Sequence, residues 1–382
     1  MAGLYVHIPF CVKRCSYCDF YSTTQLDLRD AYVTALLREM EIRRHDWQGE
    51  AFETIYFGGG TPSLLLPHEL KKVVDTIYDC FSISAHPEIT IEANPDDLSE
   101  SYVSFLKSLP FNRISIGIQS FDDRELRLLN RRHTSREAMD AVARCKEAGL
   151  TNINIDIMYG LPEQTMAGWS YALDKAIELD VSHISAYNLT CEEGTPLYQL
   201  LKRKVINPID DDLCEQFFHL LVEKLTKAGF VHYEISNFAR CDALYPFGRL
   251  SLHNTSYWKG IHYLGLGASA HSYNGVSRSW NVSSLSEYIS AISDHSDSFY
   301  ETEPLDERTR YNDYLITRLR TMWGVSLNEL RREFGTARER AFLAQSKPFI
   351  SINKLKKEGD NVKVSPEKNF ISDSIIRELI VL

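Results

Sequence analysis

The sequence of 382 residues has no uninterrupted apolar run of 18 residues, so no transmembrane helix is expected. No signal peptide is expected either, because an apolar stretch with the character of a strand starts at Leu4. Positive charge is not in excess: the formal net charge is −10, which argues against a nucleic acid as the main partner. No internal repeat or low-complexity segment is present. These absences favour a globular protein of the cytoplasm.

Most of the cysteines lack the paired spacing of a disulfide framework. Five of the eight are scattered along the chain, namely Cys80, Cys145, Cys191, Cys214 and Cys241. This scatter fits a reducing compartment, in which an iron–sulfur cluster also survives. The chain has no P-loop and no Rossmann fingerprint, because no Gly-Lys-Ser/Thr follows its Gly58-Gly59-Gly60 run.

The other three cysteines form one motif. Cys11, Cys15 and Cys18 stand in a C-x3-C-x2-C spacing directly after the apolar run 4–8. A short loop with this spacing can place three thiolates around one corner of a cubane 4Fe–4S cluster, which proteins usually hold with four cysteines. Three cysteines leave one iron open for a substrate or cofactor, as in catalytic metal sites. A zinc knuckle at Cys15 and Cys18 is the alternative, but it requires a second C-x2-C or H-x3-H pair, which the sequence lacks.

Up to about residue 190, short apolar strands alternate with amphipathic helices. The expected strands are 4–8, 54–57, 89–92, 113–119, 152–158 and 183–188. The helices between them include 30–44, 69–80, 136–148 and 167–179, and Gly149 suits the position after a helix end. Such alternation builds a parallel sheet covered by helices. Because six units are too few for a closed eight-stranded barrel, the expected fold class is α/β with a partial (β/α)6 barrel, and a doubly wound open sheet is the alternative.

Polar and glycine-rich residues follow the ends of these strands, where βα folds bind their ligands. After the cysteine loop, the strand ends are occupied by Gly58-Gly59-Gly60-Thr61-Pro62, Glu92 with Asn94, Gln119, Asp156, and Tyr187 with Asn188 and Thr190. Glycines let backbone groups approach a ligand closely, and carboxylates can hold hydroxyl groups or a cationic chain. Taken singly, the glycines also fit a tight turn, and Glu92 and Asp156 also fit ion pairs with Arg113 or Arg131. Their common place at one rim favours a ligand site.

A three-cysteine motif after the first strand is the signature of radical S-adenosylmethionine (SAM) enzymes, and the chain resembles their oxygen-independent coproporphyrinogen III oxidase branch. The matching segments are YVHIPFC (5–11), GGGTP (58–62), IQSF (118–121), DIMYGLP (156–162), YEISNFA (233–239) and GLGASA (265–270). The resemblance implies a 4Fe–4S cluster on Cys11, Cys15 and Cys18, with SAM on the open iron. By position it also implies SAM contacts from Tyr5, Tyr17, Gly59, Gly60, Thr61, Glu92, Gln119, Arg131, Asp156 and Thr190.

The sequence departs from the true oxidases of this branch in two ways. They carry a further cysteine two residues after the third, where this chain has Phe20. They also carry an N-terminal extension, whereas here the motif starts near residue 1. In addition, residues 253–258 read His-Asn-x-x-Tyr-Trp, a motif of the related HemW-type haem chaperones. The chain is therefore similar to HemW-type haem chaperones, with radical decarboxylation of coproporphyrinogen propionates as the alternative function.

A second site is expected to bind haem. Haem iron takes an axial nitrogen from histidine, and aromatic side chains can cover the face of the macrocycle. The motif predicts haem contacts from His253, Asn254, Tyr257 and Trp258. His262 and His271 are rival ligands nearby. The alternative is that His253 caps a loop and Trp258 belongs to the core.

The pattern changes after about residue 300. Amphipathic helices are expected at 306–322 and 326–334, a β-hairpin at 348–364 and a final short helix at 372–379. Together they predict a small winged-helix-like α+β domain that covers the open side of the barrel. Lys354, Lys356 and Lys357 suit a solvated hairpin tip in an acidic chain better than a DNA contact.

The sequence thus predicts three regions: a radical SAM core at 1–240, a linking region at 241–300 that holds the haem motif and a glycine-rich segment, and the winged-helix-like domain at 301–382. The predicted function is to bind a 4Fe–4S cluster, SAM and haem, and to deliver haem to haemoproteins. Whether SAM is cleaved is not decided, so no catalytic residue is assigned. A radical SAM enzyme with another substrate stays a third hypothesis. The sequence leaves open an electron donor such as flavodoxin or ferredoxin, peripheral membrane contact and a homodimer.

Overall fold

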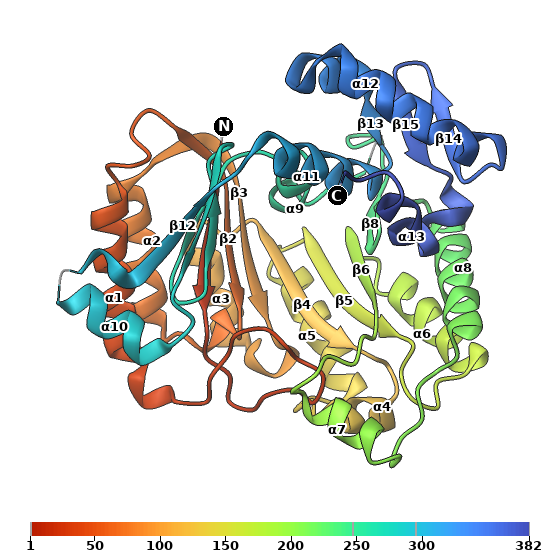
Figure 1. Cartoon of the computed structure of the whole chain (residues 1–382). Coiled ribbons are helices and arrows are strands. Elements are labelled where there is room, and N and C mark those ends of the chain that lie inside the picture. Colours follow the sequence, from red (N-terminus) through yellow and green to blue (C-terminus); the bar gives the residue numbers. More distant parts are fainter. Residues whose placement is uncertain (1, 247, 295, 382) are drawn as a thin grey trace.

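The computed structural model describes residues 2–246, 248–294 and 296–381. Its main feature is a mixed sheet of twelve strands in the order β12-β11-β10-β9-β1-β2-β3-β4-β5-β6-β8-β7 (Figure 1). The six central strands are parallel and adjacent in chain order. They are β1 (Ala2–Ile8), β2 (Ala51–Gly59), β3 (Ser82–Ala93), β4 (Arg113–Gln119), β5 (Ile153–Tyr159) and β6 (His183–Asn188).

The predicted strands and helices of this part are confirmed. Strands β4 and β6 match the prediction to the residue, whereas β2 and β3 are longer than predicted. The predicted helices correspond to α1 (Arg29–Arg43), α2 (Pro67–Cys80), α5 (Ser135–Glu147) and α6 (Met166–Glu178). The sequence analysis did not name α3 (Glu100–Ser108), α4 (Asp123–Leu128), α7 (Pro196–Lys202) or α8 (Asp211–Lys227). In Figure 1 the long helices lie on the outer side of the sheet.

The sheet stays open, as a partial barrel does. Strand β1 pairs with β9 on one side, and β6 pairs antiparallel with β8 on the other, so the two ends of the six-stranded unit do not meet. The sequential order of β1 to β6 excludes the doubly wound alternative, which requires a reversal of strand order. Side chains of β4 and β5 are almost all buried, as expected of parallel strands covered on both faces.

Later segments extend both edges of this sheet. Strands β7 (Phe230–Glu234) and β8 (Asn237–Arg240) follow β6, whereas β9 (Tyr263–Leu266), β10 (His271–Tyr273), β11 (Ser277–Asn281) and β12 (Tyr300–Pro304) continue beyond β1. Helix α9 (Leu252–Trp258) precedes β9, and α10 (Leu285–Ser293) packs against α1. Leu264, Leu266 and Tyr288 belong to the same apolar core as the barrel strands. The domain boundaries at 240 and 300 stay a prediction.

The C-terminal domain has a core and a sheet of its own. It contains α11 (Glu307–Leu319), β13 (Val325–Ser326), α12 (Leu327–Ser351), the hairpin of β14 (Leu355–Glu358) and β15 (Asn361–Val364), and α13 (Ser372–Arg377). The predicted start of the hairpin at residue 348 is wrong, because α12 continues to Ser351. That helix is interrupted at Gly335, where φ is +82°, which is why the sequence pattern stopped at 334.

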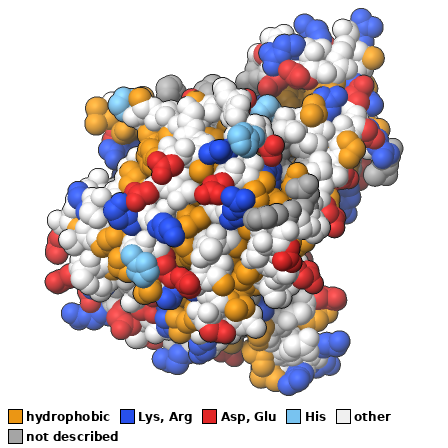
Figure 2. Space-filling view, turned by 90° about the vertical axis from the view of Figure 1, so that its left-hand side faces the viewer, with side chains coloured by type: hydrophobic (Ala, Val, Ile, Leu, Met, Phe, Trp, Pro, Cys, Tyr) orange, Lys and Arg blue, Asp and Glu red, His pale blue; other side chains and the backbone are white. Residues whose placement is uncertain are grey.

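Two surface features bear on partners. None of the helices in the described ranges is long and apolar enough to cross a membrane. On the face shown in Figure 2, Lys and Arg side chains are interspersed with Asp and Glu. That face therefore offers no extended positive field of the kind that nucleic acids require.

Candidate functional site

A cavity of about 550 Å³, here called the rim cavity, lies where β1 to β6 end. Thirteen residues were predicted to hold the cluster and SAM, and twelve of them line this cavity. These twelve are Cys11, Cys15, Tyr17, Cys18, Gly59, Gly60, Thr61, Glu92, Gln119, Arg131, Asp156 and Thr190. They come from six different strand ends, so the parallel sheet brings together residues up to 179 positions apart, from Cys11 to Thr190.

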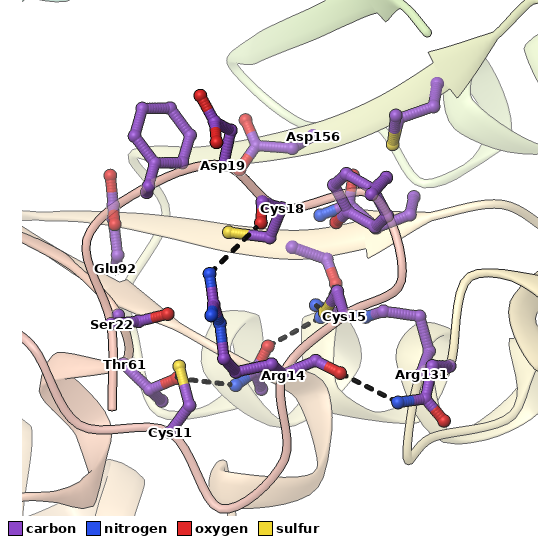
Figure 3. Close-up of a pocket in the computed structure, with 18 of the residues that line it drawn as sticks. Cys11, Arg14, Cys15, Cys18, Asp19, Ser22, Thr61, Glu92, Arg131 and Asp156 are labelled. Carbon is purple, nitrogen blue, oxygen red and sulfur yellow. Dashed lines mark hydrogen bonds between the residues drawn. The ribbon is translucent and has the colours of Figure 1, made fainter. Parts of the chain in front are cut away.

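The cysteine loop is held by backbone hydrogen bonds at both of its sides. Cys11 N–H donates to the Thr23 carbonyl (2.8 Å), and Ser16 N–H donates to the Leu129 carbonyl (3.1 Å). All three cysteines are free and partly buried. Figure 3 shows them around the cavity, with Thr61 beside Cys11 and Arg131 beside Cys15. The loop therefore presents three thiols toward one space.

The spacing of these thiols fits a cluster better than a single ion. Within residues 2–246, 248–294 and 296–381, no three His, Cys, Asp or Glu side chains converge as one metal ion would require. A cubane cluster needs no such convergence, because each cysteine ligates a different iron. The donor set of three thiols on one loop thus fits a 4Fe–4S cluster.

The glycine run forms a close contact that other residues would prevent. At Gly59, where φ is +112°, an added Cβ would lie 2.6 Å from the His7 ring. At Gly60 it would lie 2.8 Å from the Phe10 carbonyl oxygen. Gly60 N–H donates to the Ile8 carbonyl (2.8 Å), so this backbone is pressed against the end of β1, beside the cysteine loop. The glycines are required by this close approach as well as by the turn.

Two partly buried carboxyl groups face the rim cavity. Glu92 accepts hydrogen bonds from the Tyr56 hydroxyl (2.7 Å) and Gly59 N–H (3.2 Å), and burial raises its pKa to about 7. Asp156 accepts from the Asn154 amide (2.8 Å) and the Ser115 hydroxyl (3.2 Å), and burial raises its pKa as well. A buried carboxyl with a raised pKa favours a cationic ligand.

The alternative of structural ion pairs is not supported. In the described part of the chain, neither Glu92 nor Asp156 forms a salt bridge. Arg131 instead donates to Asn94 Oδ1 (2.5 Å) and the Gly117 carbonyl (2.7 Å), and its Nη1 lies 3.2 Å from Cys15 Sγ. Arg131 is therefore directed toward the cysteine loop.

Part of the cavity floor comes from residues that were not predicted from the sequence. Ser115 and Gly117 line the rim cavity together with Gln119. Alternate residues of a strand share one face. Counting back from Gln119 in steps of two would have found both positions.

Tyr5 does not reach the rim cavity. Its hydroxyl group forms a hydrogen bond with His7 Nδ1 (3.0 Å), and its side chain lines a second cavity of about 850 Å³. This second cavity, here called the aromatic cavity, lies between β1, β9, β10 and β11 on one side and α11 and α12 of the C-terminal domain on the other.

Of the predicted haem motif on α9, His253 is buried and Asn254, Tyr257 and Trp258 are partly buried. His253 is 3% exposed, and both ring nitrogens are engaged, Nδ1 with Thr54 Oγ1 (2.7 Å) and Nε2 with the Tyr257 hydroxyl (2.8 Å). Burial lowers its pKa to about 3. Of the four motif residues only Tyr257 lines the aromatic cavity, while His262 and His271 both do. His253 is thus a core residue that joins β2 to α9.

Comparison with known proteins agrees with this geometry. The model of the radical SAM superfamily matches residues 5–176, and that of the HemN C-terminal domain matches residues 305–367. The chain has the fold of coproporphyrinogen III oxidase (HemN) from Escherichia coli, with a TM-score of 0.85 and 22% identity over 100% of this chain and 90% of that one. The fold and the three-cysteine rim are those of a radical SAM protein.

Relatives that align over most of both chains show to which family of radical SAM proteins the chain belongs. Heme chaperone HemW from Bacillus subtilis (strain 168) is 33% identical over 90% of this chain and 89% of its own length. Heme chaperone HemW from Mycobacterium tuberculosis (strain ATCC 25618 / H37Rv) is 31% identical over 99% of this chain and 94% of its own length. The chain belongs to the HemW family. Membership of the radical SAM superfamily implies a 4Fe–4S cluster and SAM.

Proposed function

We propose that this protein is a haem chaperone that holds a 4Fe–4S cluster and SAM in the rim cavity and passes haem to haemoproteins. The observation that supports it most is the assembly of twelve predicted residues in one cavity of a chain that belongs to the HemW family. When bound, the cluster supplies an electron that can cleave a sulfur–carbon bond of SAM. The remaining roles fall to residues of the chain itself.

Each part of the rim cavity has a role in this proposal. Cys11, Cys15 and Cys18 hold three irons, and the guanidinium of Arg131 stabilises negative charge on Cys15. The backbone at Gly59 and Gly60 lies beside the cysteine loop, where it can bind the amino group of SAM.

The two carboxyl groups suit the other parts of SAM. The Glu92 and Asp156 carboxylates face the same space and can hold its ribose hydroxyls or its cationic chain. Both accept hydrogen bonds from neutral donors, and Arg113 is close enough to oppose the rise in both pKa values without forming an ion pair with either among the described residues.

The oxidase is the alternative, and one residue argues against it. The position two residues after Cys18 is Phe20, whose side chain is 73% exposed and lies at the border of both cavities. A phenyl group cannot replace the thiol that the oxidases carry there. The likeness to HemN, at 22% identity, extends to the fold alone.

Location and partners follow from the same proposal. A haem chaperone of this kind acts in the cytoplasm on haem and haem-accepting proteins, and an electron donor such as flavodoxin or ferredoxin serves the cluster. A homodimer and peripheral contact with a membrane stay open within it.

One experiment separates the chaperone from the oxidase. The protein is reconstituted anaerobically with iron, sulfide and SAM, and one sample is used both for a haem titration and for an assay of coproporphyrinogen loss. We expect stoichiometric haem binding and no loss of coproporphyrinogen when a reductant is present. Sustained conversion to protoporphyrinogen would overturn the chaperone in favour of the oxidase.

A further inference from the structure

The aromatic cavity has the composition of a site for a large flat ligand. Its walls include eight aromatic side chains besides histidines: Tyr5, Phe20, Tyr21, Tyr257, Tyr263, Tyr273, Tyr314 and Phe334. A volume of about 850 Å³ falls in the range of ligand pockets. Aromatic walls of this extent suit the faces of a macrocycle rather than a small polar metabolite.

Of the three histidines that line this cavity in the described part of the chain, His271 is the best placed to bind a metal. His7 is excluded, because Nδ1 is bonded to the Tyr5 hydroxyl and Nε2 to the Tyr21 carbonyl. Nε2 of His262 is packed against Gly275, where an added Cβ would lie 2.7 Å away. His271 is exposed on the inner face of β10, and neither ring nitrogen has a hydrogen-bond partner in the described structure. Burial lowers its pKa, which keeps the imidazole neutral and able to ligate.

Cationic groups lie near Tyr273, which is on the same face of β10 as His271. Tyr273 is two residues along β10 from His271 and pairs with Arg278 on β11. Burial raises the pKa of Tyr273, and Arg310 of α11 is among the cations close enough to oppose that rise. Two residues of strand span about 7 Å, which is comparable with the distance from the centre of a tetrapyrrole to its rim.

One of these cations has no partner of its own. Arg278 forms an ion pair with Asp313, and Arg318 forms one with Glu329. Arg310 forms none among the described residues, and its Nε is buried without a hydrogen-bond partner. An unpaired guanidinium in a cavity favours a carboxylate ligand.

We propose that the aromatic cavity is the haem site, with His271 as the axial ligand of the iron and Arg310 as the group that holds a propionate. The site rests on the proposed haem-chaperone function and replaces His253 as the ligand. In this arrangement the α9 motif supports the wall: His253 fixes the Tyr257 hydroxyl, and Tyr257 faces the haem. Phe20 stands between the haem and the rim cavity, so the two sites share one loop.

The first test is a haemin titration of the full-length protein, followed by Soret absorbance and by resonance Raman spectroscopy of the reduced form. The wild type is expected to show an iron–histidine stretch. His271→Ala should lose that band and at least tenfold in affinity, and added imidazole should restore the spectrum. His262→Ala should keep the iron–histidine band, and the surface control His219→Ala should bind haemin as the wild type does.

The possible outcomes separate this site from the function itself. A wild-type protein that binds no haem overturns the proposed function and the site together. A wild type that binds haem without an iron–histidine band, or His271→Ala that keeps the band, overturns the site alone. Loss of the iron–histidine band in His262→Ala would also overturn the site alone, because it would make His262 the ligand. Because His271 is exposed, loss of folding is not expected, and a thermal melt checks it.

A second test concerns the propionate and does not depend on His271. Arg310→Gln should lower the affinity for haemin about tenfold, and haemin dimethyl ester should bind the wild type about tenfold more weakly than haemin. The ester should bind Arg310→Gln and the wild type equally, because the interaction is already absent. If Arg310→Gln lowers the affinity for the ester further, the assignment of Arg310 to the propionate is wrong. Lys356→Gln, on the C-terminal hairpin far from the cavity lining, is the matched charge control.

Discussion

The rim cavity and the aromatic cavity share the loop at Asp19 and Phe20 but are built by different means. The rim cavity collects residues from the C-terminal parts of successive parallel strands and from the loops that follow them. The aromatic cavity collects side chains from the faces of β1, β9, β10 and β11 and from two helices of the C-terminal domain. The rim cavity therefore depends on the order of the strands. The aromatic cavity depends on how the C-terminal domain packs against the large sheet.

Their chemistry differs in the same way. The rim cavity has thiols, glycines and two carboxyl groups whose pKa values are raised by burial, which suits a cluster and a cationic cofactor. The aromatic cavity has tyrosines, histidines and an unpaired arginine, which suits an apolar macrocycle with carboxylate substituents. One loop can therefore separate two ligand sites, because the rim cavity lies at strand ends and the aromatic cavity lies on strand faces.

The largest effect is expected from removal of the three thiols, which should empty the rim cavity of its cluster and leave the aromatic cavity unchanged. The triple variant Cys11→Ala, Cys15→Ala, Cys18→Ala should lose all cluster iron and sulfide, because it removes every thiol of that loop. Iron and sulfide analysis with EPR measures this. The double variant Cys80→Ala, Cys241→Ala is the matched control and should keep the cluster. Full iron content in the triple variant would refute the rim cavity as the cluster site.

The wall of the aromatic cavity can be tested at His253, which holds the Tyr257 hydroxyl. His253→Ala should destabilise the fold by about 2–4 kcal/mol, because it leaves the Thr54 and Tyr257 hydroxyls without their partner in the core. Chemical denaturation measures the free energy of unfolding. Below the melting temperature its haem spectrum should match the wild type. If His253→Ala has normal stability and a shifted Soret band, His253 and not His271 is the ligand of the haem iron.

The carboxyl groups of the rim cavity provide the next test. Glu92→Ala and Asp156→Ala should each weaken SAM binding roughly tenfold, since a charged hydrogen-bond partner is worth about 1.5–3 kcal/mol. The cluster and the haem affinity should stay unchanged. Calorimetry with SAM measures the effect, with Glu41→Ala on the exposed face of α1 as the control. Unchanged SAM affinity in both rim variants would contradict the proposed roles.

The smallest effect is a pH dependence that distinguishes the cavities. The pKa of Glu92 is raised to about 7, so lowering the pH through neutrality protonates it and removes the charge that attracts SAM. SAM affinity should fall about threefold from about pH 7.5 to about pH 6.5. Glu92→Gln should abolish this dependence, whereas Asp156→Asn should keep it. A slope that persists in Glu92→Gln would assign the titration to another group.

Local sequence determined the rim cavity almost completely. Parallel βα units place the C-terminal parts of their strands and the loops after them at the same edge, so knowledge of the strands was enough to gather Cys11, Glu92 and Asp156. The exception is Tyr5 of β1: its hydroxyl group is bonded to His7 and its side chain lines the aromatic cavity, and the strand pattern does not show this choice of partner. The sequence pattern did end the predicted helix at 334, just before the interruption at Gly335, but it did not show that α12 continues from there to Ser351.

Only the tertiary structure decided the place of the haem motif and the existence of the aromatic cavity. The motif spacing could not show that Thr54 and Tyr257 occupy both nitrogens of His253, because Thr54 is 199 residues away in the chain. Nor could it show that α11 brings Arg310 to the same cavity as His271. The physical reason is that strand ends are set by local periodicity and topology, whereas burial and partners of a side chain are set by packing between distant elements.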